Sequence, residues 1–372
     1  MQQNKLWLII AQSGRALAAS AARAGYMTFV MDRFGDLDTR AITSHFHLLE
    51  DDNKEFNINY LLDTVNKYSN SGFAGVITGS GLEAHPSVLD FISQKWPLYG
   101  NDAETVMACK DPVRFFGLLE KLQIPYPEVV YEVCAMDGEW LIKLTGGTGG
   151  CHISGYTQGG KLPEGSYLQK KMDGRSLSVV FLADGRNCQV IGINEIWPVA
   201  PENHDYRYLG AVTLTEIESR LYGELEAITH TLVQALKLKG LCGLDVIIDE
   251  HDQCHVLEIN PRPTATFELH EHNGNLFEAH IQACQGRLQT SSGLKNICFA
   301  HKVIYAKEDF IVPEFDWPIW TTDRPAVGTQ TKKHDPVCMI QIEAPDVQQI
   351  HQLLDIRTQA LQQLMPLHKL AA

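Results

Sequence analysis

The hydrophobic positions of the first hundred residues predict alternating strands and helices. Short apolar runs with the length of buried strands occur at 6–10 (LWLII), 26–32 (YMTFVMD) and 72–79 (GFAGVITG). Segments between and after them have helical character: RALAASAARAG, closed by Gly25, then FNINYLLDTVNKYSN and HPSVLDFISQKW. This rhythm predicts a small parallel α/β domain with a Rossmann-like shape.

The first turn of this domain raises the alternative of a dinucleotide site. A strand, a glycine turn, a helix and then Asp32 imitate the dinucleotide fingerprint. However, the turn contains Gly14 alone rather than G-x-G-x-x-G, and a single glycine is weak support. We therefore expect the shape of the domain without that cofactor.

The pattern changes after NDAETVMACKDP and becomes rich in strands. A helix is predicted at 111–123, followed by strands in EWLIKLTGGTGGCHI and SYLQKKMDGRSLSVVFLADG. The segment IESRLYGELEAITHTLVQALKLKG predicts a long helix with Gly240 as its stop. Residues 241–263, LCGLDVIIDEHDQCHVLEINPRP, then predict a hairpin whose turn is EHDQ.

The glycine-rich stretch 146–150 (GGTGG) is a candidate phosphate loop. Glycines allow several backbone N–H groups to converge on an anion, although a flexible hairpin tip would explain the same residues. It is not a Walker A loop, because no Gly-Lys-Ser/Thr follows. Lys143, three residues earlier on an otherwise apolar strand, is placed to reach a nucleotide phosphate. By themselves these residues leave both interpretations open.

The hairpin adds a cluster of oxygen ligands. Glu258, Asn260 and Arg262 would share one face of a strand, and a short turn would bring Asp245 beside the first two. Carboxylate and amide oxygens suit Mg²⁺, which completes its octahedron with phosphate oxygens and water. Arg262, two positions further along, would meet negative charge on a transferred phosphoryl group or an acyl phosphate. The alternative is a solvated strand face, with Arg262 paired to Glu268 or another carboxylate.

Composition narrows the class of partner. A net charge of −14 argues against nucleic acid, and no apolar run approaches the roughly 18 residues of a membrane span. The start reads as a first strand rather than a signal peptide. Nine dispersed cysteines suit buried thiols in a reducing compartment, so we expect a cytoplasmic protein.

With these motifs in order, the chain resembles the ATP-grasp superfamily of ATP-dependent ligases, in the three-part layout of biotin carboxylase. The resemblance covers roughly residues 1–270 and rests on Lys110, Lys143 with the glycine loop, the hinge LQKKM, Asp245 and the E-I-N-P-R strand. It implies an α/β ATP-grasp fold with an N-terminal Rossmann-like domain (1–105), an ATP-grasp domain (106–285) and a small C-terminal α+β extension (286–372). Residues 125–175 would be the lid and hinge subdomain.

The resemblance also implies a role for each motif. ATP phosphates would contact Lys110 and Lys143, and the loop would close over them as a lid. The adenine would lie at the hinge, with the backbone of Lys170 and Lys171 reading its edge. Asp245, Glu258 and Asn260 would hold Mg²⁺, which Mn²⁺ could replace, and Arg262 would be catalytic. The full set of implied nucleotide-binding residues is Lys110, Lys143, Gly146, Gly147, Thr148, Gly149, Gly150, Gln169, Lys170, Lys171 and Met172.

The chain departs from the family after the hinge. Many relatives carry a ribose-binding glutamate in a G-x-E-x-S pattern, whereas this chain has Ser176 at the position of the acid. The first metal ligand is Asp245 rather than glutamate. The C-terminal segment DRPAVGTQTKKHDPVCMIQIEAP resembles a carboxylase-like subgroup, some of whose relatives serve the cofactors of one-carbon metabolism.

The activity implied is ligation of a carboxylate to an amine through an acyl phosphate, with small-molecule substrates and neither nucleic acid nor a membrane as partner. Bicarbonate-dependent carboxylation through carboxyphosphate is a second enzyme class. A nucleotide-binding regulatory protein with an inactive site is a third alternative. A homodimer stays open as the state of assembly.

Overall fold

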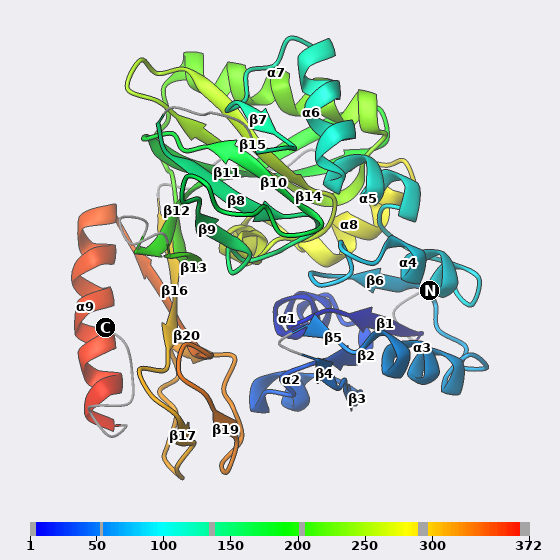
Figure 1. The fold of residues 1–372 in the computed structure, drawn as a ribbon. Coiled ribbons are helices and arrows are strands. Elements are labelled where there is room, and N and C mark those ends of the chain that lie inside the picture. The colour runs from blue at the N-terminus through cyan, green and yellow to red at the C-terminus, as the bar shows by residue number, and fades with distance from the viewer. Residues whose placement is uncertain (1–4, 53–54, 134–137, 201–204, 289–296, 365–372) are drawn as a thin grey trace.

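The computed structural model describes residues 5–52, 55–133, 138–200, 205–288 and 297–364. The chain forms an N-terminal α/β unit, a central unit built on a large sheet, and a C-terminal extension (Figure 1). The mixed α/β class with an N-terminal parallel sheet, predicted from the sequence, is confirmed.

The N-terminal unit is built on a parallel sheet in the order β3-β2-β1-β6. Its predicted strands are present, whereas β3 was not foreseen because HFHL is short and half polar. The carboxyl ends of these parallel strands lie at one edge of the sheet, so the loops after β1, β2 and β6 gather there. The elements of this unit are β1 (Leu6–Ile10), α1 (Arg15–Arg23), β2 (Met27–Asp32), α2 (Leu37–Ile42), β3 (His45–Leu48), β4 (Asp51–Asp52), β5 (Glu55–Phe56), α3 (Ile58–Lys67), β6 (Val76–Thr78) and α4 (Pro86–Ser93).

Asp32 shapes the loops at this edge. One carboxylate oxygen accepts the Gly14 N–H at 3.0 Å, and the other accepts the N–H groups of Phe34 at 3.2 Å and Gly35 at 2.8 Å. The residue that imitates the dinucleotide acid is thus fully buried and bonded to the backbone of two turns.

Helices α5 (Ala103–Lys110) and α6 (Pro112–Lys121) connect this unit to a small antiparallel sheet. The order of that sheet is β7-β10-β8-β9, and it contains both the strand with Lys143 and the hinge. Its strands are β7 (Val129–Val130), β8 (Trp140–Leu144), β9 (Ile153–Gly155) and β10 (Ser166–Lys170).

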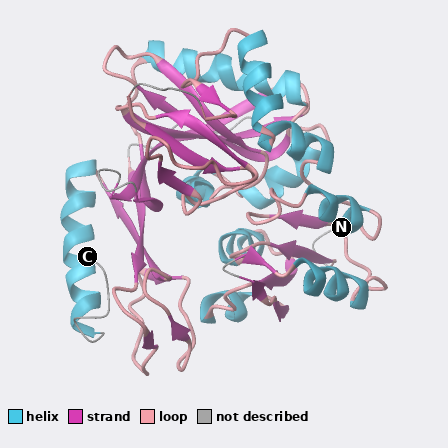
Figure 2. Ribbon diagram, viewed as in Figure 1, coloured by secondary structure: helices cyan, strands magenta, loops and turns pink. Residues whose placement is uncertain are grey.

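The large sheet runs in the order β15-β14-β11-β12-β13-β16-β20-β18 and joins the central unit to the C-terminal extension (Figure 2). Alternate residues of β11 face opposite sides of it, as the strand period requires. Val179 packs with α7 residues such as Leu225, whereas Val180 packs toward Phe277 of α8 and Trp7 of the N-terminal unit. The elements of the sheet and its covering helices are β11 (Arg175–Asp184), β12 (Cys188–Ala200), β13 (Asp205–Thr213), α7 (Ser219–Leu236), β14 (Lys239–Ile248), β15 (Cys254–Asn260), a 3₁₀ helix at Ala265–Asn273 and α8 (Leu276–Cys284).

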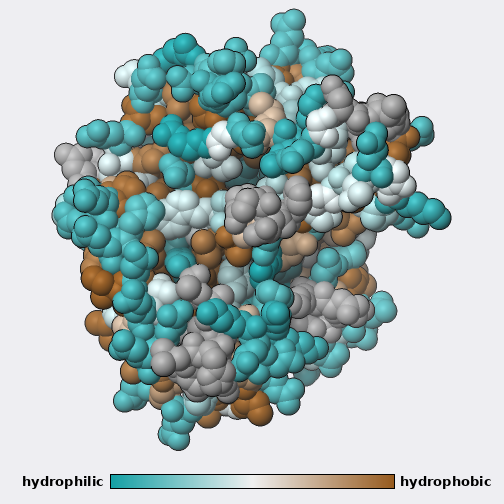
Figure 3. All heavy atoms as spheres, turned by 60° about the vertical axis from the view of Figure 1, so that its left-hand side comes forward, coloured by the Kyte–Doolittle hydropathy of each residue, from teal (hydrophilic) through white to brown (hydrophobic). Residues whose placement is uncertain are grey.

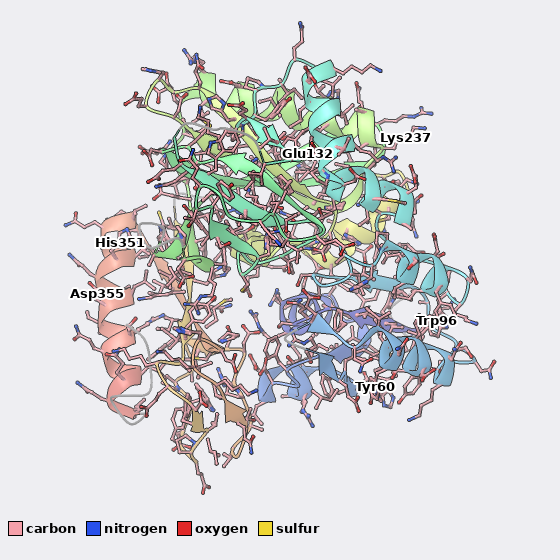
Figure 4. The ribbon with its side chains drawn as sticks, viewed as in Figure 1. Tyr60, Trp96, Glu132, Lys237, His351 and Asp355 are labelled. Carbon is pink, nitrogen blue, oxygen red and sulfur yellow. The ribbon has the colours of Figure 1, made fainter. Side chains whose placement is uncertain are left out.

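The predicted end of the long helix was wrong. Helix α7 ends at Leu236, and the exposed Lys237 (labelled in Figure 4) adopts the left-handed conformation with φ 56°. Gly240 lies in β14 instead, where an added Cβ would come within 2.5 Å of the His280 ring. A positive φ of 76° and close packing of a buried histidine, rather than helix termination, account for this glycine.

The C-terminal extension continues the large sheet through β16, β20 and β18, and its strands β17 and β19 form a separate two-stranded sheet. Strand β16 pairs with β13, and α9 lies along the outer side, where its His351 (labelled in Figure 4) contacts the Trp197 ring of β12. The extension's exposed apolar side chains include Ile311 at the end of β17 and Ile319 in a loop. Figure 3 shows hydrophobic patches mixed with hydrophilic ones on this side of the molecule. The elements are β16 (Cys298–Tyr305), β17 (Phe310–Ile311), β18 (Thr321–Thr322), β19 (Gln330–Thr331), β20 (Pro336–Ala344) and α9 (Val347–Leu364).

Among the described helices, none is both long and apolar enough to cross a membrane.

Candidate active site

The β14–β15 hairpin brings the three proposed metal ligands together. Asp245 lies directly opposite Glu258, and Gly243 lies opposite Asn260. The Asn260 amide nitrogen donates to Asp245 Oδ2 at 2.9 Å and to Glu258 Oε1 at 3.3 Å. The predicted adjacency of these side chains is therefore present.

Lys110 provides the cation of this cluster. It is the last residue of α5 and is buried, and its Nζ donates to Glu258 Oε2 at 3.0 Å and to Asn260 Oδ1 at 2.8 Å. Carboxylates on neighbouring strands repel each other unless a positive charge lies between or beside them. The Lys110 ammonium supplies that charge in the structure.

Ionisation differs between the two carboxylates. Burial and the charge of Glu258 raise the pKa of Asp245 to about 7, although a hydrogen bond to Ser178 opposes the rise. For Glu258, burial disfavours the charged form, but the charges of Lys110 and Lys143 outweigh it and hold the pKa well below its usual value. Buried Lys143 in turn has a lowered pKa, because desolvation exceeds the attraction of the carboxylates.

The donor set fits Mg²⁺ with one condition. Two carboxylates and an amide oxygen are hard ligands of the type that Mg²⁺ uses together with phosphate oxygens. In the structure, however, the amide nitrogen of Asn260 faces the carboxylates and its oxygen faces Lys110. A bound ion would therefore require the amide to turn, with Lys110 released from its oxygen.

The glycine loop lies between β8 and β9 and approaches two other parts of the chain. Gly146 has φ 74°, and an added Cβ there would lie 2.7 Å from Ala84 Cα in the loop after β6. The Gly149 carbonyl accepts the Tyr208 N–H at 3.0 Å, which joins the loop to β13. Gly147, Thr148 and Gly150 complete the same loop. The loop is thus packed between the N-terminal unit and the large sheet.

His152 follows the loop and was missed by sequence reasoning. Its buried Nδ1 has no hydrogen-bond partner among the described residues. Burial lowers its pKa to about 4, with Glu258 opposing this effect and Lys143 adding to it. A neutral imidazole therefore lies beside the lysine and carboxylate cluster. In the sequence, its position directly after the glycine loop is the signal that could have identified His152 as a site residue.

Backbone N–H groups of the hinge already donate hydrogen bonds within the protein. The backbone N–H of Lys170 donates to Glu128 O at 2.8 Å, and that of Lys171 donates to Glu139 O at 2.9 Å. The side chain of Gln169 is buried, and its Nε2 has no partner in the described part of the chain. Lys170 and Lys171 would therefore contact the edge of a base through their backbone carbonyls. Met172 follows them in the chain.

Arg262 reaches the site from beyond the strand. Strand β15 ends at Asn260, so the expectation that Arg262 continues its face was wrong. Its Nε donates to Glu83 Oε1, its Nη1 to Pro263 O at 3.1 Å, and its Nη2 to Asn260 Oδ1 at 3.4 Å. The guanidinium nevertheless stays within hydrogen-bonding distance of the cluster.

Arg262 does pair with a carboxylate, as the alternative allowed, but that carboxylate is not Glu268. Glu268 pairs instead with Arg15 of α1, at 2.5 Å and 2.9 Å, and Arg15 also contacts Asp323 of the C-terminal extension at 3.0 Å. The carboxylate partner of Arg262 is Glu83, which is distant in sequence and lies in a loop without a recognisable motif. Only the folded arrangement identifies these pairs.

Comparison with known proteins places this geometry in a family context. Residues 109–266 match the ATP-grasp domain family. No curated protein is significantly similar to the chain in sequence.

Several solved structures share the fold across nearly the whole chain. Rhizobium etli pyruvate carboxylase has a TM-score of 0.74 at 13% identity, over 95% of this chain but only 37% of that longer chain. The biotin carboxylase domain of Hydrogenobacter thermophilus 2-oxoglutarate carboxylase has a TM-score of 0.70 at 11% identity, covering 91% of this chain and 86% of that one. L-Amino acid ligase from Bacillus licheniformis has a TM-score of 0.70 at 14% identity, covering 95% and 96%.

At these identities the structural likeness establishes the fold, and the family match establishes the domain within it. The predicted resemblance to the ATP-grasp superfamily and the predicted fold class are confirmed: the chain carries an ATP-grasp domain at residues 109–266, and its fold is shared with biotin carboxylase and L-amino acid ligase.

Proposed function

We propose that this protein is an ATP- and Mg²⁺-dependent ligase that joins a carboxylate to an amine. The observation that carries the proposal is the convergence of Lys110, Asp245, Glu258 and Asn260 in one hydrogen-bonded cluster, with Arg262 bonded to its edge. Lys143 lies close enough to this cluster for the charges of Glu258 and Asp245 to oppose the lowering of its pKa by burial, and the glycine loop follows Lys143 in the chain. Such a cluster is suited to binding and neutralising a polyphosphate.

In the proposed reaction, a substrate carboxylate oxygen attacks the γ-phosphorus of ATP. The bond from that phosphorus to the β–γ bridging oxygen breaks, giving an acyl phosphate and ADP. The amine nitrogen then attacks the acyl carbon, the carbon–oxygen bond to phosphate breaks, and the amine loses a proton as the amide forms. Bound Mg²⁺ would neutralise charge on the phosphate oxygens.

The residues of the chain would position these groups and supply charge. Asp245, Glu258 and Asn260 would hold the ion, while Lys110 and Lys143 would contact phosphates as charged donors. Arg262 would hold acyl phosphate oxygens through a pair of parallel N–H groups, which a lysine cannot supply. The loop at 146–150 would exclude water, which otherwise hydrolyses an acyl phosphate.

The nucleotide is proposed to be ATP, with its adenine at the hinge. The buried Gln169 supports this placement, because its Nε2 has no partner among the described residues and is a donor that a base acceptor would satisfy. The Hydrogenobacter thermophilus domain is described in complex with the magnesium salt of ADP, which agrees with the proposed cofactors.

The substrates, pathway and assembly rest on narrower support. The L-amino acid ligase covers a similar length and agrees with carbon–nitrogen bond formation. A role in the biosynthesis of one-carbon cofactors rests on the C-terminal sequence resemblance alone. A homodimer is proposed by analogy with the dimeric biotin carboxylase domain.

A second candidate is carboxylation through carboxyphosphate, favoured by the bicarbonate complex of the Hydrogenobacter thermophilus domain. It differs from ligation in that bicarbonate alone would support release of ADP.

The test is a screen of carboxylates and amines for Mg²⁺-dependent ADP release, with bicarbonate as a separate arm. ADP release that requires both a carboxylate and an amine supports the ligase. Release with bicarbonate supports the carboxylase. ATP binding without turnover in every arm supports the inactive regulatory protein.

A further inference from the structure

We propose that Glu83 of the N-terminal unit is a positioning residue for Arg262 in the reaction proposed above, and that the active site therefore extends across the boundary between the two units. The inference rests on the proposed ligase function. It adds a residue that carries no family motif and does not reach the metal cluster itself.

Glu83 is held at both of its carboxylate oxygens. Oε1 accepts the Nε–H of Arg262, and Oε2 accepts the backbone N–H of Gly81 at 2.6 Å. The side chains of Glu83 and Arg262 are 3% and 12% exposed. Burial disfavours the charged form, but Arg262 and Lys110 outweigh it and lower the pKa of Glu83. A charged carboxylate is therefore fixed against the arginine.

The bonds of Arg262 leave a defined pair of donors. A guanidinium has five N–H groups in a planar fork. Glu83, Pro263 O and Asn260 Oδ1 accept one bond each, from Nε, Nη1 and Nη2. Among the described residues, the remaining N–H on Nη1 and the remaining N–H on Nη2 have no partner. Each terminal nitrogen therefore keeps one donor that could be offered to the oxygens of a carboxylate or phosphate.

Glu83 determines how this fork is oriented. The bond from Nε to Glu83 fixes one edge of the guanidinium. The bond from Nη2 to Asn260 is long, at 3.4 Å, and constrains it less. Without Glu83, the guanidinium would keep its charge but could rotate about its last side-chain torsions. Small misplacements of a positioning group can cost on the order of 100-fold in rate.

The same loop also contacts the proposed lid. Ala84 follows Glu83, and an added Cβ on Gly146 would come within 2.7 Å of Ala84 Cα. The loop after β6 therefore fixes the arginine through one residue and abuts the glycine loop through the next. This arrangement would align the lid with Arg262, which would donate hydrogen bonds to the acyl phosphate.

A purely structural alternative is an ion pair that only joins the two units. Its effect would be confined to stability, because loss of one partner leaves a buried charge uncompensated. Glu278 provides a matched control, since it accepts the Tyr26 hydroxyl and joins the same two units. Glu278→Gln therefore removes a carboxylate from the same boundary and leaves Arg262 in place.

The experiment compares Glu83→Gln, Arg262→Lys, the double variant and Glu278→Gln with the wild type. ATP affinity, melting temperature and the single-turnover rate of ligation are measured on each preparation. Glu83→Gln is expected to lower the single-turnover rate by about 10- to 100-fold with ATP affinity unchanged. The double variant is expected to be no slower than Arg262→Lys alone, because Glu83 acts through the arginine. Glu278→Gln keeps the wild-type rate.

If Glu83→Gln does not fold, Glu83→Asp replaces it, since aspartate keeps the charge but withdraws it from Nε by one methylene. A stable Glu83 variant with the wild-type single-turnover rate overturns the inference, and so do additive effects in the double variant. A wild-type protein that never releases ADP in the substrate screen overturns the proposed function and this inference with it.

Discussion

Replacement of Glu258 by glutamine is the sharpest test of the proposed metal cluster. Glutamine keeps the shape of the side chain but removes the charge that Lys110 contacts at 3.0 Å. It also removes one of the two carboxylates proposed to hold Mg²⁺. We therefore expect the variant to lose Mg²⁺-dependent ADP formation while it keeps the fold.

The two consequences of this change differ in size. Breaking a buried ion pair costs roughly 3–5 kcal/mol of the free energy of unfolding. The Glu258 side chain is 35% exposed, and Lys110 keeps its bond to Asn260, so solvent screening reduces the expected cost to about 1–2 kcal/mol. The loss of metal-dependent activity should exceed roughly 100-fold, because even residues that only support a metal ligand contribute about 10- to 100-fold.

The assay follows ADP release at increasing Mg²⁺ concentrations, together with unfolding in urea. Glu104→Gln is the control, because Glu104 pairs with Arg114 at the surface, where the two side chains are 70% and 43% exposed. That variant should leave both stability and activity nearly unchanged, because an exposed ion pair contributes little. A folded Glu258→Gln protein with wild-type turnover and wild-type Mg²⁺ dependence would refute the assignment of the cluster.

Three further predictions concern other parts of the site and its scaffold. Lys143→Ala should weaken ATP binding at least about tenfold, measured by calorimetry, because a buried phosphate needs a close cation. Replacement of the exposed Lys121 by alanine is the control. An ATP affinity equal to that of the control would mean that Lys143 contacts no phosphate. Gly146→Ala should impair single-turnover ligation, because Gly146 combines φ 74° with close approach to Ala84. Gly117→Ala is the control, since an added Cβ at Gly117 meets open space. Equal rates for the two variants would show that the loop adapts freely. Burial raises the pKa of Asp32 from 3.8 to about 6, so the folded state retains a proton that the unfolded state has released, and this residue's contribution to stability falls between about pH 4 and pH 6. The urea stability of Asp32→Asn relative to wild type should therefore rise by up to roughly 3 kcal/mol as the pH increases from about 4 to about 7, and a pH-independent difference would contradict the assigned pKa.

The sequence determined much of the nucleotide-binding part because its signals are local. Period-two patterning and the EHDQ turn predict the β14–β15 hairpin, and a bulge between Asp245 and Val246 then shifts the register so that Asp245 lies opposite Glu258. Lys143 and the glycine loop likewise follow from a strand, a turn and a strand that are contiguous in the chain. Such features depend on neighbours a few residues apart, so the order of motifs also predicted the family.

Tertiary structure decided the partners of the charged groups. The Arg262–Glu83 pair joins residues that are 179 positions apart, and the Arg15 pairs with Glu268 and Asp323 span 253 and 308 positions. No periodicity relates such residues, because their proximity arises only when separate units pack together. Gly240 shows the same limit at short range: the sequence suggested a helix stop, whereas the space required by His280 of another helix explains the glycine. Local patterns thus determined the strands and turns of this protein, while burial of charge between its units determined which carboxylate faces which cation.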